Sequence, residues 1–426
     1  MKRRFIAVIL SILMLFTVVS CGGGSAATGN SDAGVKAASN NPLAKTPYSD
    51  GPDTMENIVK KIVSRYQLEE LSEEDKNYEV NLGYYNCDHM TAGPIGEYTG
   101  IYKLLGMNVK VTGNANVPEA MQAGQMDMAY CGWTTTLSAV QKNVPLFIAA
   151  ENHTGGAEYL VVRKGIDMAD PKNLIGKSVS IGTDAEKSNL NWAEWTEKLG
   201  IPRDSTQYEA MSMKDADEYL AMAAGKLDAY ICCDPWGTMA KYSDVGNIII
   251  RQNTDRTAEG LGHGTCCKVA MNYNFAKAHP KLAERMLLAH TLCLEFCYEH
   301  PYLASVGFSG YYNVPVKVAL ENFWRKFVNE GRTLRWDLNR SYMDNQLATM
   351  RHYGIRDDIN NVNLDDYVDL TYFNNSGADD FEKFIKENID PVFPEGQSWE
   401  DYYKRALAID GIEEKDIPEY ASIDRK

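Results

Sequence analysis

The chain has 426 residues and 44% of them are hydrophobic, so it is long enough for more than one domain and apolar enough for a large core. Its 43 basic and 58 acidic residues give a net charge of −15, which argues against a general binder of nucleic acids or of anionic membranes. We therefore expect a soluble body of two lobes with an appendage.

The N-terminus predicts an export signal over residues 1–20. A basic head, MKRR, precedes an apolar run over residues 5–19 that is too short to span a membrane well. The run leads into VVSC at residues 18–21, which resembles the bacterial lipobox, so we expect cleavage before Cys21 and lipidation of its thiol. The alternative is an ordinary signal peptide followed by a chance cysteine.

A flexible tether is predicted after this cleavage site, over residues 21–76. Its first part, residues 22–52, is rich in Gly, Ser, Ala and Asn and has few large apolar side chains. Such a segment cannot bury enough apolar surface to offset the entropy that is lost on ordering. The tether would join a membrane anchor to the folded body.

Two stretches of the body repeat each other. Residues 123–133 read AGQMDMAYCGW and residues 224–236 read AGKLDAYICCDPW, so that Gly124 and Gly225 lie 101 residues apart. Around each stretch, the hydrophobic pattern predicts a strand, a helix, a strand, a helix and the cysteine-bearing strand, followed by a further apolar run. The other expected strands lie at 78–85, 108–112, 146–150, 177–184, 207–210 and 247–252, with helices at 117–123 and 214–224.

This order of elements predicts two α/β lobes. Strands that alternate with helices pack as a mostly parallel sheet covered on both faces. In such sheets, ligands bind beyond the carboxyl ends of the strands, where loops and helix N-termini converge. The loops after the predicted strands are therefore the candidate site.

The candidate ligand-binding residues come from these loops. They are Tyr85, Asp88, His89, Thr91, Trp133, Thr134, Glu151, His153 and Thr154 in the first repeat, and Thr183, Ser188, Asp234 and Trp236 in the second. Trp133 and Trp236 follow corresponding strands, so we expect their rings to hold a flat or apolar part of a ligand from opposite sides, unless each ring packs under its own loop. Thr91 and Ser188 would either donate to an anionic group at helix N-termini or cap those helices.

The charge of these loops favours a neutral, zwitterionic or amine-bearing organic ligand. The loops of the first repeat contain no Lys or Arg, whereas the acidic and histidine side chains of both repeats are Asp88, His89, Glu151, His153, Asp184 and Asp234, against Lys187 alone. A simple inorganic anion normally takes a cationic partner. These loops therefore disfavour an inorganic anion as the ligand.

The nine cysteines do not form a repeated CxxC zinc pattern. Cysteines at the ends of buried strands are usually small hydrophobes, so we expect core packing for Cys131, Cys232 and Cys233, and for Cys293 and Cys297 on one face of a helix over 280–299. A metal or haem-type site built from Cys87, His89, Cys131, Cys232 and His263 is an alternative, and so are disulfides. We predict no metal and no cofactor.

The ordered set of motifs resembles the solute-binding lipoproteins of ABC importers, in the nitrate, sulfonate, taurine and thiamine-precursor group called NMT1/SsuA-like. The resemblance covers residues 78–345. It rests on VVSC at 18–21, GYYNCDHMTAGPIGEYTGIYKLLGMNVKV at 83–111, EAMQAGQMDMAYCGWTTT at 119–136, AAENHTGGAEYLVVRKGI at 149–166, NLIGKSVSIGT at 173–183 and KLDAYICCDPW at 226–236. The number of cysteines and an acidic C-terminal extension depart from the group.

The resemblance implies a type II periplasmic-binding fold, in which two lobes joined by two crossovers close over a small ligand. Lobe 1 would comprise residues 77–162 and 264–375, lobe 2 residues 163–263, and a helical extension residues 376–426. The crossovers would lie near 159–163 and near 262–266.

The resemblance also implies a function. The protein would be a monomer, lipid-anchored to the bacterial cell membrane and facing the periplasm or the cell exterior, which delivers a small organic solute to an ABC permease and ATPase. It would bind no nucleic acid and would not be an enzyme, because no Ser/His/Asp or Cys/His catalytic grouping stands out. The alternatives are a nitrate- or sulfonate-type anion binder, a ligand sensor for a membrane partner, and a thiamine-pyrimidine-synthase-like or metal-binding protein.

Overall fold

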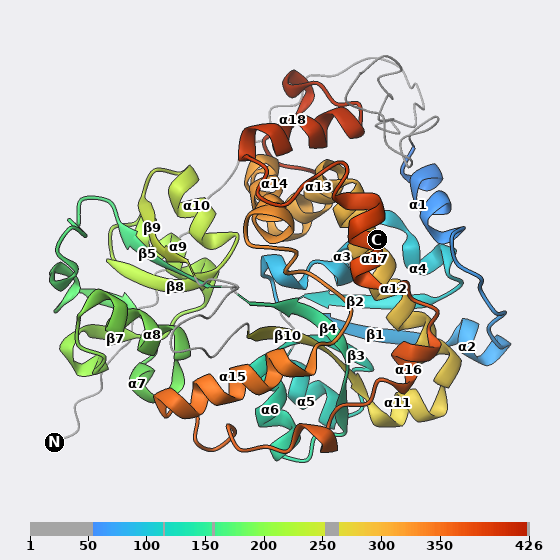
Figure 1. Ribbon diagram of the computed structural model, residues 1–426, viewed down its shortest axis with the longest axis horizontal. Helices are drawn as coiled ribbons and strands as arrows, with labels where there is room; N and C mark the ends of the chain where they lie inside the picture. Colours follow the sequence, from blue (N-terminus) through green and yellow to red (C-terminus); the bar gives the residue numbers. More distant parts are fainter. Residues whose placement is uncertain (1–53, 114–115, 156–157, 252–263, 424–426) are drawn as a thin grey trace, which may run out of the picture. The chain divides into compact units, whose positions relative to one another are not determined.

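The computed structural model describes residues 54–113, 116–155, 158–251 and 264–423 (Figure 1). The predicted signal peptide, Cys21, residues 22–53 of the predicted tether and His263 lie outside the described residues. The prediction of a flexible tether is wrong for residues 54–76, because a helix over Met55–Val63 buries Ile58, Val59 and Ile62 in the core of the first sheet. Within the described ranges, no helix combines the length and the apolar character that a membrane crossing requires.

The first sheet has five strands in the order β2-β1-β3-β10-β4. Strand β1 pairs in parallel with β2 and β3, and β10 runs antiparallel between β3 and β4. The strands are β1 (Glu79–Tyr84), β2 (Asn108–Gly113), β3 (Met128–Gly132), β4 (Leu146–Thr154) and β10 (Thr265–Asn272). The carboxyl ends of β1 and β3 therefore meet at one edge of the sheet, where β10 begins.

The second sheet repeats this arrangement in the order β7-β6-β8-β5-β9. Strand β6 pairs in parallel with β7 and β8, and β5 runs antiparallel between β8 and β9. The strands are β5 (Glu158–Arg163), β6 (Ser178–Ser180), β7 (Glu209–Met211), β8 (Ala229–Cys233) and β9 (Gly246–Arg251). Strand β5 belongs to this sheet from Glu158 onward, whereas the boundary expected at residue 162 assigns most of it to the first lobe.

Helices cover both faces of the first sheet (Figure 1). A core of apolar side chains from β1, α3 and α12 lies on one face, and a second core from β3, α5 and α6 lies on the other. The helices are α1 (Met55–Val63), α2 (Glu73–Asn77), α3 (Ala92–Thr99), α4 (Ile101–Leu104), α5 (Val117–Gln122), α6 (Trp133–Gln141), α11 (Tyr273–Ala278) and α12 (Pro280–Glu299). Covering both faces explains why the strands of this sheet are nearly continuous apolar runs.

The second sheet is also covered on both faces. The fully buried rings of Trp192 and Trp195 on α8 pack with Leu160 and Val179 on one side, and Tyr230 and Cys232 pack with α9 and α10 on the other. The helices are α7 (Ala185–Ser188), α8 (Leu190–Leu199), α9 (Asp215–Ala223) and α10 (Trp236–Tyr242).

The C-terminal third of the chain is helical and packs on this framework. Its elements are α13 (Pro301–Tyr312), α14 (Val316–Trp324), the π-helical segment Arg325–Asn329, α15 (Arg340–Tyr353), α16 (Thr371–Asn375), α17 (Phe381–Phe384), the π-helical segment Ile385–Ile389 and α18 (Trp399–Ile409). Helix α18 begins where Ser398 Oγ accepts from the Asp401 amide at 3.1 Å, and Tyr402 and Ile409 on its inner face are buried. The helices expected in the C-terminal extension are thus present, and α18 contacts α13 and α14.

The predicted repeat is confirmed as a repeat of sheet topology. The α/β class with two sheets, the strands expected from the alternating patterns and the helix expected over 280–299 are all observed. The two sheets are mixed rather than fully parallel, because β10 and β5 each return antiparallel between two neighbours.

Candidate functional site

A cleft of about 490 Å³ is lined by residues that follow the strands of both sheets. The first sheet contributes residues of the loops after β1 and β3 and the start of β10, and the second contributes the start of β5, the end of β8 and residues 188–191. Its volume falls in the range of small-molecule sites. Of the predicted site residues, the cleft is lined by Tyr85, His89, Trp133, Thr134 and Ser188.

The other predicted residues lie outside this lining. Asp88, Thr91, Glu151, His153, Thr154 and Asp234 are buried behind it, Thr183 is exposed, and Trp236 is half-buried. Thr91 donates its hydroxyl to the Asp88 carbonyl, and Thr154 Oγ1 lies 3.4 Å from the Thr333 carbonyl. These hydroxyls serve local structure.

Trp133 is the aromatic residue of the predicted pair that lies in the cleft. It begins α6 directly after β3, only 3% of it is exposed, and its Nε1 has no hydrogen-bond partner among the described residues. Trp236 begins α10 and faces Tyr219, with ring centroids 6.3 Å apart. The expected pair of opposed rings is therefore not formed in the described structure, and of the two tryptophans only Trp133 lines the cleft.

The acidic side chains that we expected to face the ligand are paired with cations instead. Glu151 forms an ion pair with Lys268 of β10, in which both side chains are fully buried. Asp234 pairs with Arg325 at 2.6 Å, and Asp88 lies 3.6 Å from Lys326. The loops of the first repeat contain no Lys or Arg, but β10 and the π-helical segment supply the cations that pair with these acids. These acids consequently say nothing about the charge of the ligand.

Glu158 is the carboxylate that lines the cleft, and the sequence analysis missed it. It begins β5, accepts a hydrogen bond from Asn191, and burial raises its pKa to about 7. The alternating pattern predicted the strand over which it lies. Glu158 is the first residue of this strand, and the cleft lies at the strand ends, so its position was the available signal for a role at the cleft.

Replacing Glu158 with glutamine is expected to alter how stability depends on pH. The Glu158 pKa of about 7, against an ordinary 4.5, means that the folded chain keeps a proton which the unfolded chain has released between these values. Its stabilising contribution is present below the unfolded pKa and lost as the pH rises through the folded pKa, by at most about 3 kcal/mol. Urea unfolding at about pH 5 and about pH 8 measures the loss. Equal losses in wild type and Glu158→Gln would contradict the assignment.

Two further polar side chains leave atoms without partners at the cleft. Asn191 and Gln346 both line it and are almost fully buried, and the Asn191 Oδ1 and Gln346 Oε1 atoms have no hydrogen-bond partner among the described residues. Buried polar atoms without a partner cost free energy. Trp133 Nε1 is a third such atom, so three residues of the cleft lining keep a buried polar atom without a hydrogen-bond partner among the described residues.

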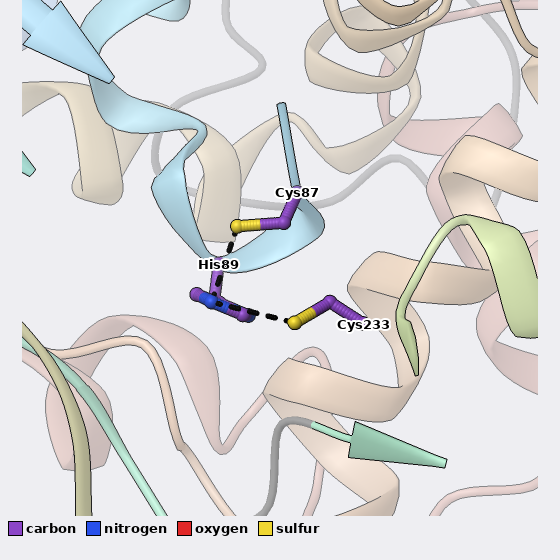
Figure 2. A group of neighbouring side chains, drawn as sticks. All are labelled: Cys87, His89 and Cys233. Carbon is purple, nitrogen blue, oxygen red and sulfur yellow. Dashed lines mark hydrogen bonds between the residues drawn. The ribbon is translucent and has the colours of Figure 1, made fainter. Parts of the chain in front are cut away.

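A cluster of thiols and an imidazole forms one wall of the cleft. His89 lies between two cysteines, with its Nε2 at 3.1 Å from Cys87 Sγ and 4.0 Å from Cys233 Sγ (Figure 2). Cys87 and His89 flank the start of a 3-10 turn over Asp88–Met90 after β1, and Cys233 is the last residue of β8. The first and second sheets therefore both contribute to this group.

Cys266 and Cys267 complete the cluster. Cys266 Sγ lies 3.9 Å from His89 Nε2 and 3.4 Å from Cys267 Sγ. Neighbouring residues of a regular strand point to opposite faces, but the pairing of β10 with β4 shifts register between Thr265 and Lys268. This bulge lets two consecutive cysteines reach the same cleft. We refer to Cys87, His89, Cys233, Cys266 and Cys267 as the thiol–imidazole cluster.

The cluster differs from the set that the sequence suggested as an alternative metal site. Cys232 points into the core beside Tyr230, because residues alternate along β8 and Cys233 takes the cleft side. Cys131 lines the cleft but belongs to neither group of close ligand atoms, and burial raises the pKa of its thiol to about 12. Cys293 and Cys297 are fully buried in the core, so core packing is confirmed for them.

Electrostatics in the cluster favour separated charges. The hydrogen bond from Cys267 is the main reason that the pKa of Cys266 lies well below its usual value, although burial opposes the change. Burial lowers the pKa of His89, but the nearby thiols outweigh it and hold the pKa well above the usual range. Both shifts favour the charged forms of the groups, an imidazolium and a thiolate.

Two sheets of repeated topology, with a ligand-sized cleft lined from both, define the class of bilobal binding proteins. A family model described as the NMT1-like family matches residues 73–305, more than half of the chain, and the chain belongs to this family. A search of curated proteins found no match.

Solved structures show the same fold. The ligand-binding component of an ABC-type import system from Staphylococcus aureus, solved with zinc bound, is 13% identical, with 71% of this chain and 100% of that chain covered and a TM-score of 0.57. The nitrate-binding protein NrtA from Synechocystis PCC 6803 is 13% identical over 79% of this chain and 98% of that chain, with a TM-score of 0.53. The alkanesulfonate-binding protein SsuA from Xanthomonas axonopodis pv. citri, bound to MOPS, is 15% identical over 65% and 92%, with a TM-score of 0.51. The fold is that of periplasmic binding proteins.

Proposed function

We propose that the protein is the extracytoplasmic solute-binding component of an ABC-type importer. The observation that carries the proposal is the cleft of about 490 Å³, which is lined by residues from both sheets, Trp133, Asn191 and Gln346 among them. The family and the fold support it, because the similar structures include binding proteins of import systems. The partners would be an ABC permease and its ATPase.

The cleft supports a binding role over a catalytic one. Ligand contacts from two sheets are complete only when both sheets face the same solute, so binding shifts the population towards the closed arrangement. A permease reads such a change at the surface of the protein. Export and lipidation at Cys21, which the sequence predicts, would hold a monomer at the outer side of the bacterial cell membrane.

The solute class follows from the lining. Among the described residues that line the cleft there is no Lys or Arg, and the ionisable groups include Glu158, His89 and thiols. A nitrate- or sulfonate-type anion would find no Lys or Arg in this lining, and the thiols around His89, which raise its pKa, compete for its charge. A neutral, zwitterionic or amine-bearing organic solute fits better, and this proposal now rests on the cleft lining rather than on Asp88, Glu151 and Asp234.

Trp133→Ala is expected to weaken solute binding, whereas Trp236→Ala is expected to leave it unchanged. The Trp133→Ala variant loses an aromatic ring from the cleft lining, which is worth about 1–2 kcal/mol or roughly a 5- to 30-fold increase in Kd. A thermal-shift panel of amino acids, amines, pyrimidines, sulfonates and metal ions identifies the solute, since binding to the folded state raises Tm. Isothermal titration of both variants then gives the Kd.

Two outcomes would count against the receptor. Stabilisation by nitrate or an alkanesulfonate alone would overturn the solute class, and a Kd unchanged in Trp133→Ala would remove the cleft from the binding site. Uptake assays in cells with and without the gene test delivery, because a receptor that only signals would leave uptake intact.

A further inference from the structure

We propose that the thiol–imidazole cluster binds a soft metal ion, Zn²⁺ or Cu⁺, as the cation of the captured solute. That the ion is the imported solute rests on the proposed function, whereas its coordination rests on the residues of the cluster alone. The ion would arrive either free or bound to a small organic chelator, and in both cases the same cysteine and histidine atoms would coordinate it.

The spacing of the ligand atoms fits a single ion. Two groups of three, Cys87–His89–Cys233 and His89–Cys266–Cys267, each have all their ligand atoms within 4.8 Å of one another, and both share His89. In a tetrahedral zinc site with Zn–S of about 2.3 Å and Zn–N of about 2.0 Å, a sulfur and a nitrogen lie about 3.5 Å apart. The observed sulfur–nitrogen distances of 3.1, 3.9 and 4.0 Å bracket this value. Adjustments of about half an ångström would complete the site.

The imidazole is already oriented as a metal ligand. His89 Nδ1 lies 3.1 Å from Asp88 Oδ1, which leaves Nε2 facing the sulfurs. In protein metal sites, a carboxylate that accepts the second ring N–H fixes the tautomer and the orientation of the ligating histidine. Asp88 is itself held beside Lys326 at 3.6 Å, and stacking on His153 at 4.9 Å between ring centroids fixes the other face of the ring.

The donor set selects the class of metal. Four thiols and one imidazole, without a carboxylate or carbonyl in either group, suit Zn²⁺ or Cu⁺ and not Mg²⁺ or Ca²⁺. Each thiol that becomes a ligand loses its proton to solvent, and His89 gives up the proton on Nε2 in the same way. No oxidant is needed, because the metal replaces protons and its oxidation state is unchanged.

Core packing alone does not explain this group. Cys293 and Cys297 show what packed cysteines look like in this chain, since both are fully buried in the apolar core of α12. The cluster instead lines the cleft with its sulfurs around a histidine. All eight described cysteines are free thiols, so the sulfurs remain available as ligands.

Coordination would also close the cleft. Cys87, His89, Cys266 and Cys267 belong to the first sheet, whereas Cys233 ends β8 of the second. A backbone hydrogen bond of 2.8 Å from the Asp88 amide to the Asp234 carbonyl already joins the two loops beside the cluster. An ion bound to both sides makes contacts that exist only in the closed arrangement, as a receptor requires.

The size of the cleft is the reason for testing a chelate as well as the free ion. Its volume of about 490 Å³ far exceeds that of one ion, and Trp133, Asn191 and Gln346 lie in the same lining with partnerless polar atoms. A small organic chelator would fill the rest of this space while the cluster takes open positions on its metal.

The test is metal titration of the full chain, reduced and handled without oxygen. Zn²⁺ alone, Cu⁺ alone and preformed Zn²⁺–histidine are titrated with calorimetric readout, and Co²⁺ is added as an optical probe of thiolate ligation. We expect one ion per chain and a cobalt–thiolate charge-transfer band. Cys233→Ser and the half-buried Cys266→Ser should each raise the Kd at least tenfold, whereas Cys131→Ala, which also lines the cleft, should not. Asp88→Asn should raise it about 10- to 100-fold through the orientation of His89.

Each outcome decides between the proposals. Absence of stoichiometric binding, or equal affinities in Cys233→Ser, Cys266→Ser and Cys131→Ala variants with wild-type Tm, would overturn the metal site. If an organic solute still raised Tm, the receptor function would stand without the metal. If the metal bound as expected but deletion of the gene left metal uptake unchanged, the coordination would stand and the importer role for the ion would fall. Tighter binding of the histidine complex than of Zn²⁺ would assign the chelate as the source.

Discussion

Lys268→Met is expected to lower the free energy of unfolding by about 3–5 kcal/mol, because it leaves the buried carboxylate of Glu151 without its ion-pair partner. Lys268 Nζ lies 2.5 Å from Glu151 Oε1, and neither side chain has any exposed area. Burial raises the pKa of Glu151, and the charge of Lys268 opposes that rise. Without Lys268, Glu151 must either stay charged in an apolar setting or take up a proton, and both cost free energy.

Urea denaturation followed by circular dichroism measures this loss. The double variant Lys268→Met/Glu151→Leu should recover most of it, since replacing both partners of a buried pair is far milder than removing one. Lys60→Met is the matched control, because the pair of Lys60 with Glu56 is exposed to solvent and its loss should leave the free energy of unfolding nearly unchanged. A loss of less than about 1 kcal/mol in Lys268→Met would show that the pair does not hold β10 against β4.

The helices, the strands and their order could be predicted because each leaves a hydrophobic pattern in its own stretch of sequence. Strands such as β1 and β8 alternate or run apolar, and helix α12 begins at a proline and carries its cysteines on one face. The displacement of 101 residues then exposed the repeat, which sheet topology confirms. Hydrophobic periodicity and repetition thus sufficed for element type and order.

The partners of the acidic loop residues could not be predicted in the same way. Glu151 meets a lysine 117 residues away and Asp234 meets an arginine 91 residues away. Counting charges within the loops therefore gave a false picture of the cleft, because its neutralising cations come from β10 and the segment after α14. Only the three-dimensional structure brings these groups together.

For Cys233 and Trp236, simple sequence rules would have predicted the observed positions. Alternation along β8 places Ala229, Ile231 and Cys233 on one face, so Cys233 rather than Cys232 could have been chosen from the sequence. Trp236 lies eight residues after Asp228, whereas Trp133 lies six after Asp127, and the two extra residues move Trp236 away from the cleft. The bulge at Cys266 has no comparable sequence signal.

Arg325→Leu is expected to destabilise the protein by about 3–5 kcal/mol and to weaken binding in the cleft. Arg325 is fully buried, lies 2.6 Å from Asp234 Oδ2, and also bonds Thr238 and Glu321. Its removal leaves Asp234, in the loop directly after Cys233, without its ion-pair partner. The Asp234 carbonyl accepts a hydrogen bond from the Asp88 amide. Disorder in the Asp234 loop should therefore also displace the neighbouring residues of the thiol–imidazole cluster.

The pH dependence of this loss has a definite sign. Burial raises the pKa of Asp234 in the wild-type chain and Arg325 opposes the rise, so the pKa must climb further in Arg325→Leu. A carboxyl with a raised folded pKa loses stability as the pH rises through that value. The difference in free energy of unfolding between wild type and Arg325→Leu should therefore increase as the pH rises. It should decrease as the pH falls towards the pKa of Asp in the unfolded chain.

Urea unfolding across this pH range, paired with Zn²⁺ titration, separates the two effects. Lys241→Met is the matched control, because Lys241 bonds the same Glu321 at 2.9 Å with 56% of its side chain exposed and should cost under about 1 kcal/mol. Arg325→Lys should lie between the two, since it keeps the charge but loses the planar fork that reaches Asp234 and Glu321 together. If Arg325→Leu matched Lys241→Met in stability at every pH, Asp234 would have another neutralising partner, and Lys326, already beside Asp88, would be the group to replace next.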